Sequence, residues 1–434
     1  MASFSIPLTG LEADSTALNT IANDLSNMNT TAYKSQTTNF ADLFYQQIGT
    51  TGSGDPIQVG AGVRAASNET DFTQGSINAT GNSTDVALNG NGFFVLGDGT
   101  GSYEYTRAGN FTLGSTGELL TSSGMNVMGY PAVNGVVNTN APLTAINIPV
   151  GAVQQPQAST TMSMTTNLDS ASGAATQFPA EITVYDSLGQ SHVATVTYQQ
   201  TGTNTWSYSV ALPAADYSTS GGNAVPAAIT GTMQFNSSGA LTGITPTGGT
   251  AETVGTATGD VSSMALNFTP AGSALANGAA GMNLQWNLLS SAGTPTISQV
   301  DTTSAVSATA QNGYPSGQYQ SFAIGSDGTV TVTYSNGQQQ NVGQLALANI
   351  ANLQGLSLLG SDNYATTLAS GAAVIGTSGA AGLATVQDQA LEASNVNIST
   401  EFSNLIVAQR AFEANAKSVT TFDTVTQDTI NMVH

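Results

Sequence analysis

Apolar residues recur with helical spacing near the start of the chain. They fall seven positions apart, or three positions from a member of that series, along one side of a helix. These positions include Leu11, Leu18, Ile21, Leu25 and Met28. Asp24 falls on the opposite, polar face. Pro7 suits the first turn of a helix and the Asn- and Thr-rich run 27–31 suits its end, so the pattern predicts an amphipathic helix within 1–30.

The other end of the chain carries the same spacing for longer. Apolar residues repeat every seventh position for about six heptads, and others fill the offsets of three or four. The positions are Leu391, Ile398, Phe402, Leu405, Phe412, Val419, Phe422, Ile430 and Val433. Heptads of this length predict a helix over 391–434 with a coiled-coil seam, which must face another helix. We therefore expect 1–30 and 391–434 to form one helical coiled-coil core layer.

Between the two ends the pattern is that of strands and turns. Short alternating or continuous apolar runs, separated by Gly-rich turns, predict β structure. They lie at 85–96, 103–113, 181–185, 192–198, 206–212, 282–288 and 329–334. Asp327-Gly328 and Asn336-Gly337 flank the last run, as hairpin turns do. The predicted fold class is mixed and mainly β, with long N- and C-terminal α-helices.

Composition divides the β region further. A length of 434 residues is enough for two or three domains. Residues 157–309 contain seven acidic residues and neither Lys nor Arg, which marks a separate, solvent-facing outer domain. This domain is expected to be inserted in an inner β domain at 72–156 and 310–371, so that two mainly β domains are nested. Residues 31–71 and 372–390 are predicted to be linkers.

The charge balance excludes several classes of partner. With 26 acidic and 5 basic residues the formal net charge is −21, so nucleic acid is not an expected partner. No run approaches the roughly 20 apolar residues of a membrane span. The first residues also lack the basic and apolar regions of a secretory signal peptide. We therefore expect no membrane insertion and no cleaved signal.

Candidate catalytic and ligand chemistry is sparse. The chain has no Cys and two His, and no nucleophile, base and orienting residue stand together in a recognisable pattern. His192 lies in an alternating run, where it is expected to be a strand residue. Gly90 and Gly92 lack the rest of a dinucleotide fingerprint, and no Asp-Gly turn has EF-hand spacing. The sequence predicts no enzyme activity, no cofactor and no catalytic or metal site.

The few basic residues allow two interpretations. Each either pairs with a carboxylate or simply keeps the surface soluble, and those on the C-terminal helix are also candidates for contact with neighbouring helices. They are Lys34, Arg64, Arg107, Arg410 and Lys417, all outside 157–309.

Long motifs stand in a fixed order along the chain. GLEADSTALNTIANDLSNMNTTAYKSQ occupies 10–36 and ALEASNVNISTEFSNLIVAQRAFEANAKSVTTFD occupies 390–423, with LNGNGFFVL at 88–96 and YTRAGNFTL at 105–113 between them. Together they resemble the rod and hook family of bacterial flagellar axial proteins. EITVYDSLGQSHVATVTYQ, at 181–199, is similar to the outer domain of its hook members.

One residue departs from the family pattern. Ala32 stands where the family commonly has Gly before an aromatic-Lys pair. If the backbone there has a positive φ angle, Ala costs about 1 kcal/mol or more. The turn at this position is therefore expected to differ from that of the family.

The resemblance implies a structural role. It implies a subunit that self-assembles into the tubular hook, the flexible joint that transmits torque from rod to filament and encloses the export channel. The implied partners are further copies of the chain, the rod, hook-cap and hook–filament junction proteins, and the flagellar type III export apparatus. The implied location is the extracellular hook and basal body. The expected assembly interface consists of the apolar helix positions named above, from Leu11 to Ile430, together with Arg410.

Two alternatives stay open at this stage. A distal rod or other flagellar axial subunit would share the terminal motifs, although the insertion around 181–199 favours the hook. A secreted β-rich glycan-binding protein would need clustered exposed aromatic residues or a pair of catalytic carboxylates. Trp206 and Trp286 are instead eighty residues apart.

Overall fold

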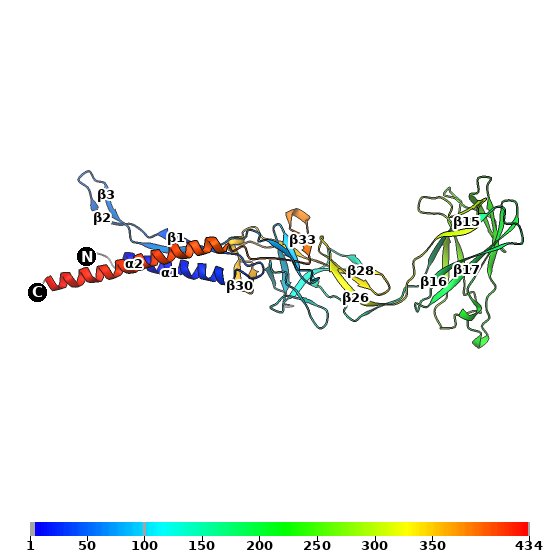
Figure 1. Cartoon of the computed structure of the whole chain (residues 1–434), viewed down its shortest axis with the longest axis horizontal. Helices are drawn as coiled ribbons and strands as arrows, with labels where there is room; N and C mark the ends of the chain where they lie inside the picture. The colour runs from blue at the N-terminus through cyan, green and yellow to red at the C-terminus, as the bar shows by residue number, and fades with distance from the viewer. Residues whose placement is uncertain (1–4, 99–100, 433–434) are drawn as a thin grey trace. The chain divides into compact units, whose positions relative to one another are not determined.

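The computed structural model describes residues 5–98 and 101–432. The chain divides into two compact units. The terminal unit comprises Met1–Val150, Gln320–Thr333 and Gln339–His434, and the middle unit comprises Gly151–Tyr319 and Tyr334–Gln338. Strands predominate and a helix lies at each end of the chain (Figure 1), so the predicted mainly β class is confirmed. Val433 lies outside the described residues.

Two helices belong to the terminal unit. α1 spans Ser5–Ser26 and α2 spans Ile398–Met432, and they lie side by side (Figure 1). The bounds of α1 agree with the prediction. The C-terminal helix begins later than predicted, because the side chain of Asn397 accepts hydrogen bonds from the backbone N–H groups of Ser399 and Thr400 and so caps its first turn.

The prediction that Leu391 belongs to the C-terminal helix is wrong. Leu391 lies in strand β34 (Ala390–Glu392), where it pairs with Asn78 of β5 (Ile77–Ala79). This pairing joins segments that are more than 300 residues apart in the sequence. The heptad spacing could not reveal it, because a single apolar position fits the helical and the extended pattern equally well.

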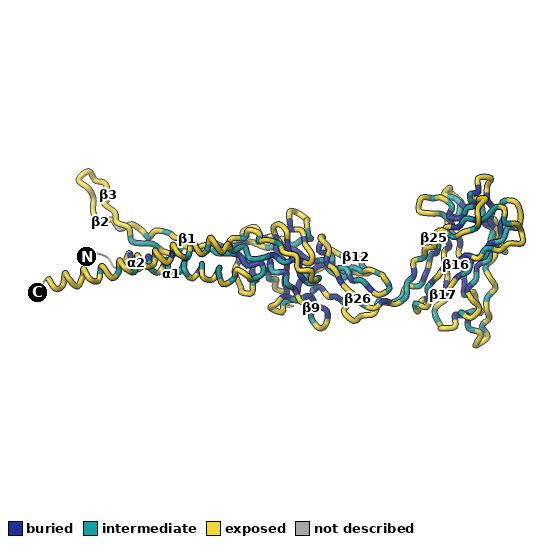
Figure 2. Tube along the Cα trace, viewed as in Figure 1, coloured by how far each residue is buried: buried dark blue, intermediate teal, exposed yellow. Residues whose placement is uncertain are grey.

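A long β-hairpin follows α1, within the range predicted to be a linker. β1 (Gln36–Asp42) pairs with β4 (Val63–Thr70), and β2 (Gln46–Thr50) pairs with β3 (Pro56–Val59). Gly62 lies against α1: its φ is +108°, and a Cβ there would clash with Thr9 Oγ1. The backbone N–H of Val63 donates to the same oxygen at 3.3 Å. Much of the surface of these strands is exposed (Figure 2) and their alternation is weak, so the sequence pattern does not predict them.

The β core of the terminal unit contains strands that precede the middle unit in the sequence and strands that follow it. Its main sheet includes the paired sequence β27–β28–β11–β7–β8–β31–β30, and β33 pairs with β6. Phe93, Val95, Tyr105 and Tyr364 pack in its core. The strands are β6 (Val86–Asn89), β7 (Phe93–Gly97), β8 (Tyr103–Thr106), β9 (Thr112–Leu113), β10 (Leu119–Leu120), β11 (Asn126–Val133), β12 (Val136–Val137), β13 (Thr144–Ala145), β26 (Gly317–Ile324), β27 (Thr329–Tyr334), β28 (Gln339–Leu345), β29 (Leu347–Asn349), β30 (Ser357–Gly360), β31 (Asn363–Ala365), β32 (Val374–Gly376) and β33 (Thr385–Asp388). Short 3-10 turns occupy Leu353–Gly355 and Ala380–Gly382.

The two turns predicted around 329–334 are present. β27 occupies this range, and Gly328 and Gly337 adopt φ angles of 80° and 79°. Positive φ is the conformation for which these turns require Gly.

The middle unit consists of two sheets around one aromatic core. The sheet of β16 to β21 is antiparallel, and the sheet that contains β15 is mixed. β16 to β21 pair in chain order, while β15 pairs with β23, β24 and β25. Trp206, Trp286, Tyr198 and Tyr208 are buried in its core. Buried and exposed residues alternate along strands such as β16 (Figure 2), as the sequence pattern predicts. The strands are β14 (Val153–Gln154), β15 (Thr161–Asp169), β16 (Gln177–Tyr185), β17 (Ser191–Gly202), β18 (Thr205–Ala211), β19 (Ile229–Phe235), β20 (Leu241–Pro246), β21 (Glu252–Thr253), β22 (Ser263–Asn267), β23 (Asn283–Asn287), β24 (Ile297–Val300) and β25 (Ala305–Gln311), with 3-10 turns at Ala214–Asp216 and Ser220–Gly222.

Candidate assembly interface

Small and polar residues, rather than leucines, form the most buried stripe of α1. They recur every three or four positions: Pro7, Gly10, Ala13, Ala17, Thr20 and Asp24. A Cβ on Gly10 would lie 2.7 Å from Nδ2 of Asn415, so glycine allows the close approach of α2. Asn415 donates a hydrogen bond of 2.8 Å to Asp14 Oδ2. Short side chains and a polar contact therefore hold the two helices together.

The predicted apolar stripe of α1 lies beside this contact face. Leu11, Leu18, Ile21 and Leu25 are half-buried, and Met28 is exposed. The helix thus has two adjacent stripes, one of small residues that is already covered and one of larger apolar residues that is only partly covered.

Asp24, which the sequence pattern places on the polar face of the helix, is not at the surface. Its side chain is fully buried, and it accepts hydrogen bonds from the Tyr33 hydroxyl at 2.8 Å and from the backbone N–H of Gln36 at 2.9 Å. Burial raises the pKa of Asp24 above its ordinary value, although both hydrogen bonds oppose this shift. Burial and the neighbouring Asp24 also raise the pKa of Tyr33. Asp24 therefore ties the end of α1 to the start of the hairpin.

Much of the apolar surface of α2 has no cover within the chain. Ala408 is its one buried residue among those described, while Leu405, Val419 and Phe422 are half-buried. Large apolar side chains remain exposed at Ile398, Phe402 (52%), Phe412 (37%) and Ile430. Ile406 (58%), Val407 and Val425 are also exposed, and the heptad analysis missed them because they lie outside its series. Neither described helix has the length and apolarity needed to cross a membrane.

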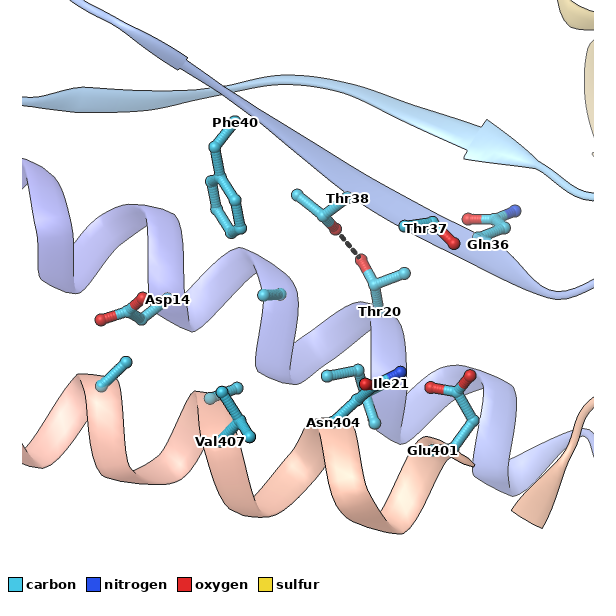
Figure 3. A pocket seen from close by; sticks show the side chains of 13 residues that line it. Asp14, Thr20, Ile21, Gln36, Thr37, Thr38, Phe40, Glu401, Asn404 and Val407 are labelled. Carbon is cyan, nitrogen blue, oxygen red and sulfur yellow. Dashed lines mark hydrogen bonds between the residues drawn. The ribbon is translucent and has the colours of Figure 1, made fainter. Parts of the chain in front are cut away.

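A groove of about 330 Å³ lies where α1, α2 and β1 meet. Figure 3 shows Phe40 projecting from β1 toward α1, with Asp14 and Glu401 along the two helices. Thr38 Oγ1 donates to Thr20 Oγ1 at 2.9 Å across the groove (Figure 3). The remaining lining is Ala17, Ile21, Gln36, Thr37, Asn404, Val407, Ala408 and Ala411. Burial raises the pKa of Glu401, and the negative charge of Asp24 raises it further.

A buried ionic centre joins the chain ends to the β core. Glu392 is 1% exposed, and its two carboxylate oxygens lie 2.6 Å from Lys34 Nζ and 2.9 Å from Arg107 Nη2. Arg107 Nη1 also donates to the carbonyl oxygens of Gly90 and Gly92, at 2.7 and 2.8 Å. Burial lowers the pKa of Lys34, and the charge of Glu392 opposes this effect. The conspicuous glycines of LNGNGFFVL thus present backbone carbonyls to the arginine of YTRAGNFTL.

The interpretation that basic residues pair with carboxylates holds for three of the five. Lys34 and Arg107 share the buried Glu392, and Arg410 pairs with Glu413 on the surface of α2 at 2.9 Å. The sequence could not identify Glu392 as the partner, because it lies 358 residues from Lys34. Arg64 and Lys417 are exposed.

Ala32 does adopt the conformation that favours glycine. Its φ is 58°, its side chain is buried, and its backbone N–H donates to the carbonyl oxygen of Glu392 at 2.8 Å. The backbone therefore meets the condition under which Ala is costly, and a turn that differs from that of the family stays a prediction. The hydrogen bond to β34 and the ion pair of the neighbouring Lys34 hold the backbone in this costly conformation.

His192 belongs to a polar cluster in the middle unit. Its Nε2 lies 3.1 Å from Asp186 Oδ2 and its Nδ1 lies 2.9 Å from Asp216 Oδ2. Burial raises the pKa of Asp186, but hydrogen bonds from Asn277, His192 and two backbone N–H groups outweigh burial and hold it below its ordinary value. His192 is a strand residue, as predicted, and its side chain contacts two segments outside its own strand, at Asp186 and Asp216.

Comparison with known proteins agrees with this architecture. Family models match in three places: the Flagellar hook protein FlgE/F/G D1 domain over 87–167, the Flagellar basal body protein FlaE D2 domain over 157–314, and the Flagellar basal body rod FlgEFG protein C-terminal over 387–432. The Flagellar hook protein FlgE of Salmonella typhimurium is 36% identical over 444 residues, which cover 99% of this chain and 100% of that protein. The chain belongs to the flagellar hook protein family.

Other members of the hook protein family are similar over comparable lengths. The Flagellar hook protein FlgE of Treponema pallidum is 33% identical, with 98% of each chain covered. The crystal structure of Helicobacter pylori flagellar hook protein FlgE2 superposes with a TM-score of 0.52 at 14% identity, covering 73% of this chain and all of that one. The latter shows a shared fold. Membership of the family makes this chain a structural subunit of the flagellar hook.

Proposed function

We propose that copies of this chain polymerise through α1 and α2 into the wall of the tubular hook, the flexible joint that transmits torque from rod to filament. The observation that carries this proposal is the uncovered apolar surface of α2, which includes Phe402 and Ile406. Full burial of one such side chain contributes about 1.5–3 kcal/mol. Neighbouring copies would provide that burial and so favour assembly.

The proposed assembly follows from heterologous contacts. Identical subunits whose contact surfaces differ do not close into a dimer, and they form a ring or an open helical polymer. In this scheme α1 and α2 form a coiled-coil core layer that encloses the export channel. The core layer comprises 1–30 and 391–434, the linkers 31–71 and 372–390, the inner β domain 72–156 and 310–371, and the outer domain, nested in the inner one, 157–309.

The proposed partners beyond further copies of the chain are flagellar. They are the rod, hook-cap and hook–filament junction proteins, together with the type III export apparatus that would carry the subunit out. Membership of the hook family supports this assignment. The proposed location is the extracellular hook of the flagellum. The role is mechanical, so no cofactor or catalytic residue is invoked.

Removal of α2 tests the proposal directly. A chain ending at Asn397 keeps Glu392 and its two ion pairs, so it should remain folded while losing assembly. We expect sedimentation and negative-stain microscopy to show polymers of the full chain and monomers of the truncated chain. Polymers formed equally well by the truncated chain would contradict the proposal.

A single substitution refines this test. Phe402→Asp removes exposed apolar surface and should raise the critical concentration for assembly at least tenfold. Gln409→Asp is the matched control, because it adds the same charge to an exposed position of α2 without removing apolar surface. Circular dichroism should show unchanged helix content in both variants. Equal effects of the two substitutions would mean that apolar burial does not drive assembly.

A further inference from the structure

We propose that the groove between α1, α2 and β1 receives the opposite side of α2 from a second copy of this chain. The inserted surface is the ridge formed by Ile406, Arg410 and Lys417. This inference rests on the proposed function and adds which surface of one copy meets which surface of the next.

The groove has the chemistry of a partly apolar, acidic receptor. Its apolar lining includes Ala17, Ile21, Ala408 and Ala411, and Phe40 projects from β1 toward α1 (Figure 3). Carboxylates of Asp14 and Glu401 lie along it, and no basic side chain is among its described lining residues. Burial and the negative charge of Asp24 raise the pKa of Glu401, against a hydrogen bond from Asn404 that lowers it.

The ridge has the complementary chemistry. Ile406 is 58% exposed, the Arg410 side chain is 77% exposed, and Lys417 is exposed. Separations of four and seven residues place all three along one side of the helix. Lys34 and Arg107 are buried in the ionic centre, so the ridge holds two of the three exposed cations in the described part of the chain.

The positions on α2 make the contact directional. At about 100° per residue, Arg410 lies roughly half a turn from Glu401 and from Ala408, which line the groove. A copy therefore cannot place its own ridge in its own groove. Its ridge can enter the groove of one neighbour while its groove receives the ridge of another neighbour. Repetition of this contact arranges the subunits around an axis, as a ring or a helical polymer. It also brings opposite charges together in subunits whose net charge of −21 otherwise makes them repel.

Intermolecular cross-linking tests this contact, and the natural chain helps because it contains no Cys. One full-length variant, Thr37→Cys, carries its cysteine in the groove. The other, Ile406→Cys, carries its cysteine on the ridge and also a mass tag. The two variants are assembled together and the polymer is then oxidised. We expect a disulfide-linked heterodimer on a denaturing gel, because a disulfide requires Cα atoms within about 7 Å. The matched control pairs Ser122→Cys, an exposed position outside both helices and the groove, with tagged Ile406→Cys and should give little heterodimer.

A charge exchange gives an independent readout. Arg410→Glu should raise the critical concentration for assembly at least tenfold, and Glu401→Lys in the same chain should recover most of the loss. If unmodified chains polymerise but the groove pair forms no more heterodimer than the control pair, the inference is overturned while the proposed function stands. If unmodified chains form no polymer, both are contradicted.

Discussion

At the residue scale, Glu392 connects several segments of the terminal unit. Its carboxylate is buried with Lys34 and Arg107, and Oε1 also accepts the backbone N–H of Gly75 at 2.9 Å. A buried ion pair contributes little compared with an apolar substitute, but removal of one partner leaves an uncompensated buried charge. In this centre, one acidic residue compensates two basic ones.

Glu392→Gln should therefore destabilise the terminal unit by about 3–5 kcal/mol. The matched control is Glu413→Gln, which breaks the exposed pair with Arg410 and should cost at most about 1 kcal/mol. Both tryptophans are buried in the middle unit, so tryptophan emission reports that unit alone. Circular dichroism of the helices should show an earlier melting transition in Glu392→Gln, with the tryptophan transition unchanged. Equal melting of the two variants would argue against this role for Glu392.

At the element scale, the pair formed by α1 and α2 carries partly buried acidic groups whose negative charges repel one another. Burial raises the pKa of both Asp24 and Glu401, and the charge of Asp24 contributes to the shift of Glu401. The titratable groups around them are Asp14 in the groove and Tyr33 against Asp24. At neutral pH both carboxylates are held in surroundings that disfavour their charge.

The helix pair should therefore become more stable as pH falls from 7 toward 5. The folded state binds protons more tightly than the unfolded state, because its carboxyl pKa values are higher, and stability then rises with acidity. Helix melting followed by circular dichroism measures this slope. Glu401→Gln should flatten it, while Glu413→Gln, at an exposed position, should leave it unchanged. A melting temperature of the natural chain that decreases as pH falls from 7 to 5 would contradict the predicted direction.

At the scale of the whole molecule, the middle unit has the features of an independent domain. Its sheets enclose their own core, which contains Trp206 and Trp286. The pKa of its Asp186 is shifted in the opposite direction from those of Asp24 and Glu401, because hydrogen bonds hold it below its ordinary value. The stability contributed by Asp186 is present above the unfolded pKa and is lost as pH falls through the folded one.

An isolated fragment covering 151–319 should fold by itself. It omits the short segment Tyr334–Gln338 of the middle unit but keeps the whole aromatic core. We expect native tryptophan emission, a cooperative melting transition, and a midpoint that decreases below about pH 4 as Asp186 is protonated. Asp186→Asn should weaken that acid dependence. An unfolded fragment with solvent-exposed tryptophan emission would show that the terminal unit is required for folding.

The sequence by itself determined the local elements. Heptad spacing specified a helix at each end, and alternation with Gly turns specified strands such as β16 and β27, because periodicity records which face of an element is buried. Only the tertiary structure decided the partners of those faces. Strand pairing of Leu391, burial of Asp24 and the role of Glu392 all depend on segments brought together by chain folding. Local periodicity carries no information about which other segment covers the buried face of an element. These contacts are therefore decided only when the chain folds.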